Sequence, residues 1–343
     1  RRFDVAIEED LIEEIARIHG YDAVPTTLPG GATRLVAPGE GRVPERDLRR
    51  ALAGRGYLEA INYAFVDAAL LQRWQLGEAL VPLANPLSAE LGVMRPRLLP
   101  GLVDALARNA ARQQGRVRLF ELGKVFSAAG SAGEAPLETP RIAAVASGDA
   151  AAEQWGTTAR RVDFHDLKGD LEGLAALSGA RLEFRPSAPS WAHPGRAAEV
   201  LRDGVVVGAI AELHPRLQQV LDLDHPAVAF ELDLAALTAR DLPRARPLSK
   251  FPSVRRDLAF IVSGSVPWGE LEATATAAAG PSLRSLRLFD VYAGKGVETG
   301  FKSVAMGLIL QDDSRTLTDR DVDAVVASVT DAVAAAHGAR IRS

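Results

Sequence analysis

The first 25 residues, RRFDVAIEEDLIEEIARIHGYDAVP, carry a dense group of carboxylates. In the helix expected from about Glu9 onward, Asp10, Glu13 and Glu14 lie at positions i, i+3 and i+4 and therefore share one face. Asp4 lies in the extended segment before this helix and can fold back toward them. Oxygen ligands of this kind suit a hard cation such as Mg²⁺. A plainer interpretation stays open, because acidic residues also stabilise a helix N-terminus by about 0.3–1 kcal/mol.

A second set of candidate residues lies near the C-terminal end of the chain. Its cations would neutralise phosphates, and its one aromatic ring could stack on an unpaired base. The members are Lys250, Phe251, Arg255, Arg256 and Lys302. The alternative is also open here: the two arginines would then be a solvated strand edge, and the phenylalanine would be a core residue. The strands of this last block show no aromatic pair of the kind that forms a stacking platform on an RNA-binding sheet.

Composition excludes several kinds of site. The chain has no Cys, which excludes disulfides and thiolate zinc sites and is compatible with the cytoplasm. The net charge of −4 does not indicate nucleic-acid binding through bulk charge, so any RNA contact must be local. The histidines match no metal-ligand spacing, and we expect them to be ordinary structural residues. The residues show no signal-peptide pattern, and the start without Met suggests a piece of a longer protein.

Pro- and Gly-rich segments divide the 343 residues into blocks. TTLPGGATRLVAPGE (26–40) and DLPRARPLSKFPSV (241–254) are the two joints. We expect three blocks, 1–40, 41–245 and 246–343, which is reasonable for a chain of this length. The middle block mixes helices with strands rather than alternating them regularly, which favours an antiparallel α+β sheet. We expect one of its strands over 58–65 and a hairpin turn at Asp203-Gly204 between two apolar runs.

The last block shows a clear order of elements. RDLAFIVS, LRSLRLFDVY and FKSVAMGLILQ read as strands, and PWGELEATATAAAG and LTDRDVDAVVASVTDAVAAAHG read as helices. ARIRS could add a final short strand. The order β-α-β-β-α-β predicts a ferredoxin-like fold. In the second helix, Thr318 is the expected N-cap residue, with acidic residues following it in the first turn.

Several phrases together resemble one protein family. The opening acidic segment, NPLSAELGVMRPRLLPGLVDALARNAARQQGRVRLFELGKVF in the middle block, and LFDVYAGKGVETGFKSVAMGLILQDDSRTLTDRDV in the last block are similar to bacterial phenylalanyl-tRNA synthetase β chains. The resemblance spans essentially the whole chain. It implies that 1–40 is the end of a magnesium-binding domain plus a linker, 41–245 a class II synthetase-like core, and 246–343 a ferredoxin-fold anticodon-binding domain.

The resemblance also implies which functions belong to this chain and which to the α chain. The family's metal ligands correspond here to Asp4, Asp10, Glu13 and Glu14, with Mg²⁺ shared with the α chain. The class II-like core is expected to be catalytically silent, and the chain lacks the Gly-rich G-x-G-x-E-R string that class II enzymes use. ATP and phenylalanine would be bound by the α subunit. Because only the last part of the metal-binding domain is present, its site could be incomplete in this chain.

The predicted function is therefore that of the non-catalytic β subunit of a phenylalanine-tRNA ligase. It would act in the cytoplasm within an (αβ)₂ tetramer that loads phenylalanine onto tRNA(Phe), and this chain alone would be inactive. Such a scaffold should expose apolar surface on the helices near 46–54 and 98–113. A stand-alone RNA-binding module is the alternative, and a metal-dependent hydrolase using the opening acids is a weaker one.

Overall fold

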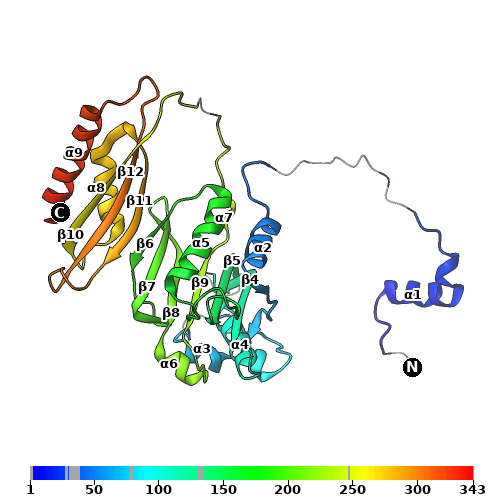
Figure 1. Cartoon of the computed structure of the whole chain (residues 1–343). Coiled ribbons are helices and arrows are strands. Elements are labelled where there is room, and N and C mark those ends of the chain that lie inside the picture. The colour runs from blue at the N-terminus through cyan, green and yellow to red at the C-terminus, as the bar shows by residue number, and fades with distance from the viewer. Residues whose placement is uncertain are drawn as a thin grey trace. The chain divides into compact units, whose positions relative to one another are not determined.

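The computed structural model describes residues 3–27, 30, 39–77, 80–129, 135–245 and 248–342. The chain divides into two compact units, 1–39 and 40–343, which are described separately (Figure 1). Among the helices of the described segments, none has both the length and the apolar character needed to cross a membrane.

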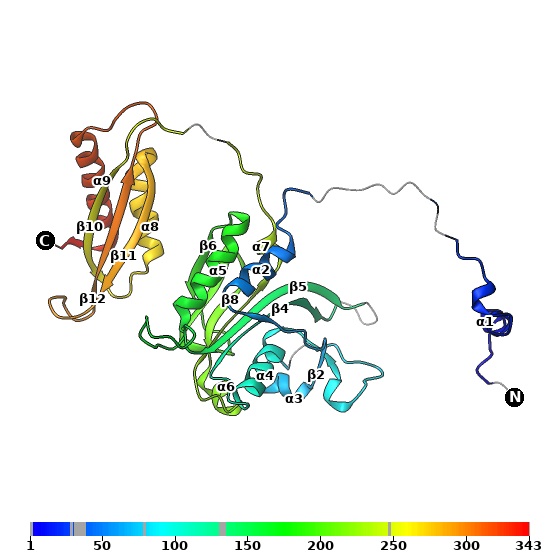
Figure 2. The same ribbon diagram turned by 45° about the vertical axis from the view of Figure 1, so that its right-hand side comes forward.

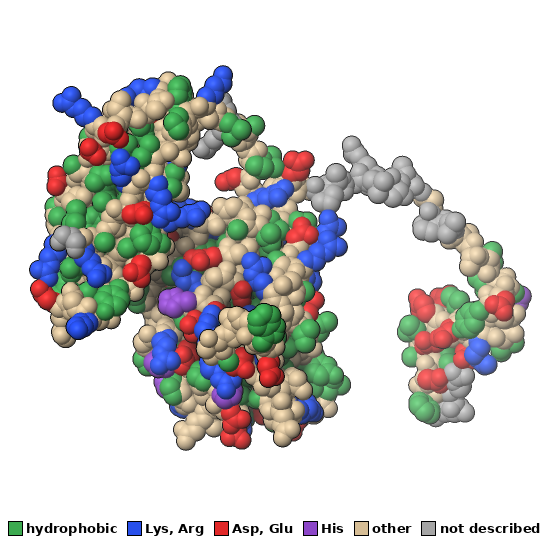
Figure 3. Space-filling view, in the orientation of Figure 1, with side chains coloured by type: hydrophobic (Ala, Val, Ile, Leu, Met, Phe, Trp, Pro, Cys, Tyr) green, Lys and Arg blue, Asp and Glu red, His purple; other side chains and the backbone are tan. Residues whose placement is uncertain are grey.

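The first unit contains helix α1 (Glu8–His19), followed by a short 3₁₀ turn (Tyr21–Ala23). The helix is amphipathic, yet none of its residues is buried. Leu11, Ile15 and Ile18, which share one face through their spacing of four and three residues, are 56%, 68% and 79% exposed. Figure 3 shows that apolar and acidic side chains both lie on the surface of this unit. Among the described residues of its own unit, therefore, no core covers the apolar face of α1.

The second unit contains a seven-stranded sheet and a separate four-stranded sheet. The larger sheet is antiparallel except where β1 pairs with β4. Its strands in sheet order are β1 (Leu58–Glu59), β4 (Arg116–Ser127), β5 (Leu137–Gly148), β9 (Ala227–Asp233), β8 (Val205–Leu213), β7 (Ala192–Arg202) and β6 (Leu182–Pro186). β2 (Phe65–Val66) and β3 (Val93–Met94) form a small ladder of their own.

Helices cover both faces of the seven-stranded sheet (Figure 2). On one face lie α2 (Glu45–Gly54), α5 (Phe164–Ser178) and α7 (Ala235–Thr238); on the other lie α3 (Ala68–Arg73), α4 (Leu99–Ala110) and α6 (Pro215–Val220). Along β5, Ile142 and Ala144 enter the first core while Ala143 and Val145 enter the second. Burial on both sides explains why this strand is a continuous apolar run without alternation.

Local signals account for the clearest elements of this sheet module. Asp163 caps α5 by accepting hydrogen bonds from the backbone of His165 and Asp166, and Gly179 ends the helix in a left-handed conformation. The expected hairpin at Asp203-Gly204 joins β7 to β8, with positive φ angles of 53° and 78° at the two turn residues.

The buried Glu231 on β9 holds the start of α4. Its Oε2 accepts hydrogen bonds from the backbone nitrogens of Leu98 and Leu99, each 3.1 Å away. These amides belong to the first turn, which has no helical partners of its own. Burial raises the pKa of the Glu231 carboxyl above its usual range, although these amides and the nearby Arg97 act in the opposite direction.

The four-stranded sheet has the order β11-β12-β10-β13 and follows the predicted β-α-β-β-α-β sequence of elements. Its elements are β10 (Val254–Ser263), α8 (Trp268–Ala279), β11 (Leu283–Tyr292), β12 (Phe301–Leu310), α9 (Asp319–His337) and β13 (Arg340–Ile341). Thr318 caps α9 as predicted, through its side chain and the backbone nitrogen of Asp321. The predictions of an α+β chain and a ferredoxin-like domain are therefore confirmed.

The middle block differs from expectation in two places. The single strand expected over 58–65 is two short strands, β1 and β2, which pair in different ladders. The helices near 46–54 and 98–113 do not expose a large apolar surface, because Leu48 and Leu52 of α2 and the leucines of α4 are fully buried. The exposed apolar side chains of this block include Leu58, Ile61 and Tyr63 near β1, and also Leu87 and Trp155 in loops.

We predict that Glu231 makes stability depend on pH. A carboxyl with a raised folded-state pKa stabilises fully below its unfolded pKa and loses that contribution as pH rises through the folded value. Glu231→Gln keeps an acceptor for the two amides and should remove this loss of stability as the pH rises above the ordinary pKa range of a glutamate. Glu231→Ala should cost about 1–3 kcal/mol because the amides lose their partner. Urea unfolding followed by fluorescence of the buried Trp74 and Trp191 measures both. Equal pH dependence in the Gln variant and the parent would contradict this assignment.

Candidate functional site

The acidic residues at the start of the chain mainly stabilise helix α1. Asp10 Oδ2 accepts hydrogen bonds from the backbone nitrogens of Ala6 at 2.8 Å and Ile7 at 3.0 Å. These bonds lower the pKa of Asp10, while the nearby Asp4 carboxylate raises it. Asp10 therefore caps the helix start, as the plainer interpretation of the sequence expects.

The other predicted metal ligands are arranged separately. Glu14 Oε2 lies 2.7 Å from the guanidinium of Arg17, one turn further along α1. Within the described segments, no three His, Cys, Asp or Glu side chains converge closely enough to hold a metal ion. The oxygen chemistry of Asp4, Asp10, Glu13 and Glu14 suits Mg²⁺, but their geometry in this unit does not form a ligand set by itself. The magnesium site stays a prediction.

The four-stranded sheet has one covered and one open face. Phe260 and Val262 of β10 point into the core with α8 and α9, as do Val304, Met306 and Leu308 of β12. Because side chains alternate along a strand, the odd-numbered residues of β10 and β12 point to the other face. We call this surface, opposite α8 and α9, the open face.

Arginine and aromatic side chains are paired across the open face. The guanidinium of Arg255 lies 5.6 Å from the ring centre of Phe289, and that of Arg342 lies 5.6 Å from the ring of Tyr292. A third pair joins Arg340 and Phe301 at 6.0 Å. Distances of this size are those of cation–π contacts. The rings remain accessible, with Phe289 52% exposed and the other two each 37% exposed.

Tyr292 is held in place by its surroundings. Its hydroxyl donates to the backbone oxygen of Lys295 at 3.2 Å. Gly294 lies so close that an added Cβ would be 2.7 Å from this hydroxyl. On the other side, Arg342 donates to Ser303 Oγ at 3.2 Å. An aromatic ring fixed in this way loses little freedom when a flat group stacks on it.

Gly307 lets two charged side chains lie across the middle of the open face. Arg255 Nε contacts Asp257 Oδ1 at 2.8 Å. A Cβ on Gly307 would lie 2.9 Å from that carboxylate oxygen and 3.2 Å from the Arg255 guanidinium. The absence of a side chain at Gly307 therefore makes room for the arginine that reaches Phe289.

The structure separates the five residues that the sequence suggested for RNA contact. Arg255 lies on the open face, whereas Arg256 points to the opposite side and lies 3.6 Å from Asp319 of α9. Lys302 also lies on the helix-covered side; its Nζ donates to the Gly264 carbonyl, and burial lowers its pKa. Before β10, Lys250 is exposed and Phe251 is half-buried.

Sequence reasoning missed the residues that surround Arg255 on the open face, namely Phe289, Tyr292, Phe301, Arg340 and Arg342. We expected no aromatic platform on this sheet. The available signal was the strand pattern LFDVY, which places aromatic residues near the end of one strand. Their proximity to Phe301 and Arg342 depends on how β11, β12, β10 and β13 pair.

The middle module contains a buried set of polar groups that form hydrogen bonds and an ion pair with one another. Arg95 and Glu121 form an ion pair, with 2.6 Å between the guanidinium nitrogen and Oε1. Asn62 donates to the other carboxylate oxygen of Glu121 at 2.7 Å, and Arg95 Nε donates to the Lys124 carbonyl at 2.9 Å. These contacts join the chain near β1 to β4. The set is structural, because each charge is matched within it.

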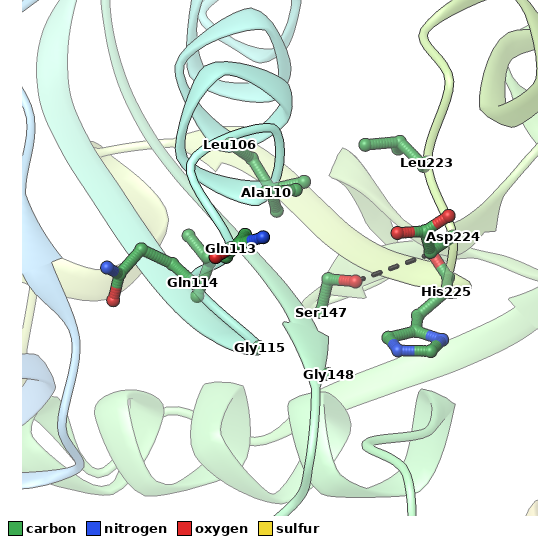
Figure 4. Close-up of a pocket in the computed structure, with 11 residues that line it drawn as sticks. Leu106, Ala110, Gln113, Gln114, Gly115, Ser147, Gly148, Leu223, Asp224 and His225 are labelled. Atoms are coloured by element: carbon green, nitrogen blue, oxygen red, sulfur yellow. Dashed lines mark hydrogen bonds between the residues drawn. The ribbon is translucent and has the colours of Figure 1, made fainter.

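A cavity of about 260 Å³ lies beside the C-terminal end of α4 and contains residue types found in hydrolases (Figure 4). Ser147, Asp224 and His225 all line it. The Ser147 hydroxyl, however, donates to the backbone oxygens of Pro226 at 3.1 Å and His225 at 3.4 Å. A hydroxyl bonded to carbonyls is not activated by a base. The cavity therefore gives no support to a serine-hydrolase site.

Comparison with known proteins identifies both modules. Residues 24–234 match the family model described as phenylalanyl tRNA synthetase beta chain CLM domain. The chain belongs to the phenylalanyl-tRNA synthetase beta chain family. Residues 249–342 match the ferredoxin-fold anticodon binding domain. The family predicted from the sequence is thus confirmed.

Similar proteins support this family membership over the whole chain. A protein named phenylalanine--tRNA ligase beta subunit from Xanthomonas axonopodis pv. citri is 65% identical over 343 residues, which are 100% of this chain and 43% of that protein. A protein of the same name from Xylella fastidiosa (strain Temecula1) is 59% identical over the same length and share. The chain thus spans 43% of the length of these relatives.

Among solved structures, a pyrrolysyl tRNA synthetase from Desulfitobacterium hafniense aligns with 56% of this chain and 64% of its own. The TM-score is 0.42 and the sequence identity 17%, values at which the likeness carries no conclusion about the fold.

Proposed function

We propose that this chain acts as part of the β subunit of a phenylalanine-tRNA ligase, which with an α subunit attaches phenylalanine to tRNA(Phe) using ATP. The observation that carries the proposal is 65% identity to such a subunit over the whole chain. The match of residues 24–234 to a synthetase beta chain domain favours this function over a stand-alone RNA-binding module. We further propose the division into 1–40, 41–245 and 246–343.

In the proposed assembly this chain does not itself catalyse the formation of a covalent bond. Its middle module would have a class II synthetase-like fold without the chemistry, and its buried Arg95–Glu121 pair would be structural. ATP and phenylalanine would bind to the α subunit of an (αβ)₂ tetramer in the cytoplasm. The chain's own work is then to hold the α subunit and to position the tRNA.

The edge of the seven-stranded sheet is the surface we assign to the α subunit. β1 is an edge strand, paired on one side with β4, and so presents unpaired backbone groups on its other side. Around it Leu58, Ile61 and Tyr63 are 71%, 92% and 72% exposed. Apolar and aromatic side chains beside an open strand edge are suited to contact with another protein chain.

The open face of the ferredoxin-like domain is the surface we assign to the anticodon loop of the tRNA. Unpaired bases stack on aromatic rings, and arginines bind the phosphates between them. Phe289, Tyr292 and Phe301 supply the rings, and Arg255 is the predicted cation that shares their face. Lys250, Phe251, Arg256 and Lys302 lie off this face and would contact flanking parts of the RNA.

The first prediction of this function concerns the α subunit. Co-expressed with a catalytic α chain, the protein should support phenylalanylation of tRNA, and Ile61→Asp should reduce it about thirtyfold or more, the loss of about 2 kcal/mol of interface. The same variant should no longer co-purify with the α chain. Val205→Asp, at a 65% exposed valine on the β7–β8 hairpin, is the matched control. Equal phenylalanylation and co-purification of the two variants would reject this docking surface. Phenylalanylation by this chain without any α chain would reject the proposed function.

A second prediction concerns base stacking. Tyr292→Leu should weaken binding of an RNA hairpin with an unpaired loop by about 1–3 kcal/mol, which is roughly 5- to 150-fold. Fluorescence anisotropy with the labelled hairpin measures this change. Tyr63→Leu removes an exposed tyrosine from the middle module and should leave the affinity unchanged. Unchanged affinity in the Tyr292 variant would contradict the assignment of the open face.

A third prediction concerns magnesium. We propose that the acidic face of α1 contributes ligands to a Mg²⁺ site completed by the α subunit, because the described residues supply no set of three by themselves. In the α–β complex, Asp10→Asn combined with Glu13→Gln should weaken binding of Mn²⁺, used as a spectroscopic probe, by about tenfold or more. Asn can still cap the helix. Glu8→Gln with Glu9→Gln, acids outside the set, should change nothing. Equal binding by both double variants would remove α1 from the site.

A further inference from the structure

The last strand, β13, adds two cations to the open face. It pairs antiparallel with β10, with Ile261 opposite Arg340 and Phe260 opposite Ile341. One residue beyond the strand, the backbone nitrogen of Arg342 donates to the Ala259 carbonyl at 2.8 Å. The backbone is thus fixed through residue 342. Because alternate residues share a face, Arg340 and Arg342 both point to the open side.

Both guanidiniums lie over aromatic rings and keep hydrogen-bonding capacity. Arg342 lies over Tyr292 and uses one N–H group on Ser303 Oγ. Arg340 lies over Phe301 and forms an exposed ion pair of 2.5 Å with Glu298. A guanidinium carries five N–H donors in a planar fork. Each arginine can therefore stay on its ring and still bind an anion along its outer edge.

We propose that Arg340 and Arg342 bind two successive phosphates of the unpaired RNA whose bases stack on the open face. This proposal rests on the proposed RNA role of that face. Residues two apart on a strand are roughly 7 Å apart, comparable with the repeat of an extended nucleotide chain. The rings beneath the guanidiniums would receive the bases that these phosphates join.

Charge on the open face agrees with a phosphate ligand. Asp257 is matched by Arg255, and Glu298 is matched by Arg340. The strand register also places one further cation, Arg287, and one further acid, Asp290, of β11 on this face, so its arginines still outnumber its acids. An exposed ion pair such as Arg340–Glu298 contributes little to stability. A phosphate can therefore replace the Glu298 carboxylate as the partner of Arg340 at a small cost in free energy. Arg342 hydrogen-bonds a neutral hydroxyl instead, so its charge adds directly to the attraction for RNA.

The salt dependence of RNA affinity tests this proposal. For single strands, each phosphate contact adds about 0.7 to the slope of log affinity against log salt. Using the full chain and a hairpin with an unpaired loop, Arg340→Gln with Arg342→Gln should lower that slope by about 1.4. The loss should be similar for loops of different sequence, because phosphate contacts carry no sequence information. Arg342→Lys should keep the slope, and Arg320→Gln on α9 is the matched control on the covered side.

The outcomes separate this inference from the function on which it rests. An unchanged slope in the double variant, with binding still weakened by Tyr292→Leu, overturns the phosphate contacts and leaves the open face as the RNA surface. If neither variant changes binding, both ideas fail. A measurement on the parent protein avoids any folding defect: RNA should protect Arg340 and Arg342 from modification by phenylglyoxal, read by mass spectrometry. Absence of protection at both residues overturns the proposal.

Discussion

Two helices cover only one side of the four-stranded sheet, and this one-sided packing determines what the domain can contact. The alternation along β10 and β12 sends Phe260, Met306 and their neighbours into the core with α8 and α9. The residues between them must then face outward. A sheet of this kind needs polar groups on its outer side to remain in water. Here those groups are arginines laid over aromatic rings, which gives the surface both charge and flat apolar area.

The seven-stranded sheet, in contrast, is covered by helices on both faces. Its central strands are buried on both sides, so its faces are unavailable for contact. What remains accessible is its two edges, at β1 and at β6, together with the connecting loops, and exposed Ile61 lies near the β1 edge. The two sheets therefore offer different kinds of surface, an edge on one and a face on the other. This difference supports assigning the edge to a protein subunit and the face to a nucleic acid.

Much of the ferredoxin-like domain could be predicted because its signals are local. Thr318 and the acidic first turn mark the start of α9, and the strand patterns give the order of elements. The alternation rule also implies that the adjacent Arg255 and Arg256 face opposite sides. The aromatic cluster could not be predicted in the same way. Phe289 lies at a bulge between β11 and β12, and a bulge changes which residues share a face. Arg342 follows β13 and contacts Tyr292 of β11, although β10 and β12 lie between these two strands in the sheet.

The bare apolar side of α1 has a consequence for how this protein assembles. A twelve-residue helix is only marginally stable in water when nothing packs against it. Its caps and the Glu14–Arg17 pair favour the helical form, but Ile15 and Ile18 contribute nothing while they stay hydrated. Covering them would supply the missing free energy, so the helical content of this segment should rise whenever another surface packs against Ile15 and Ile18.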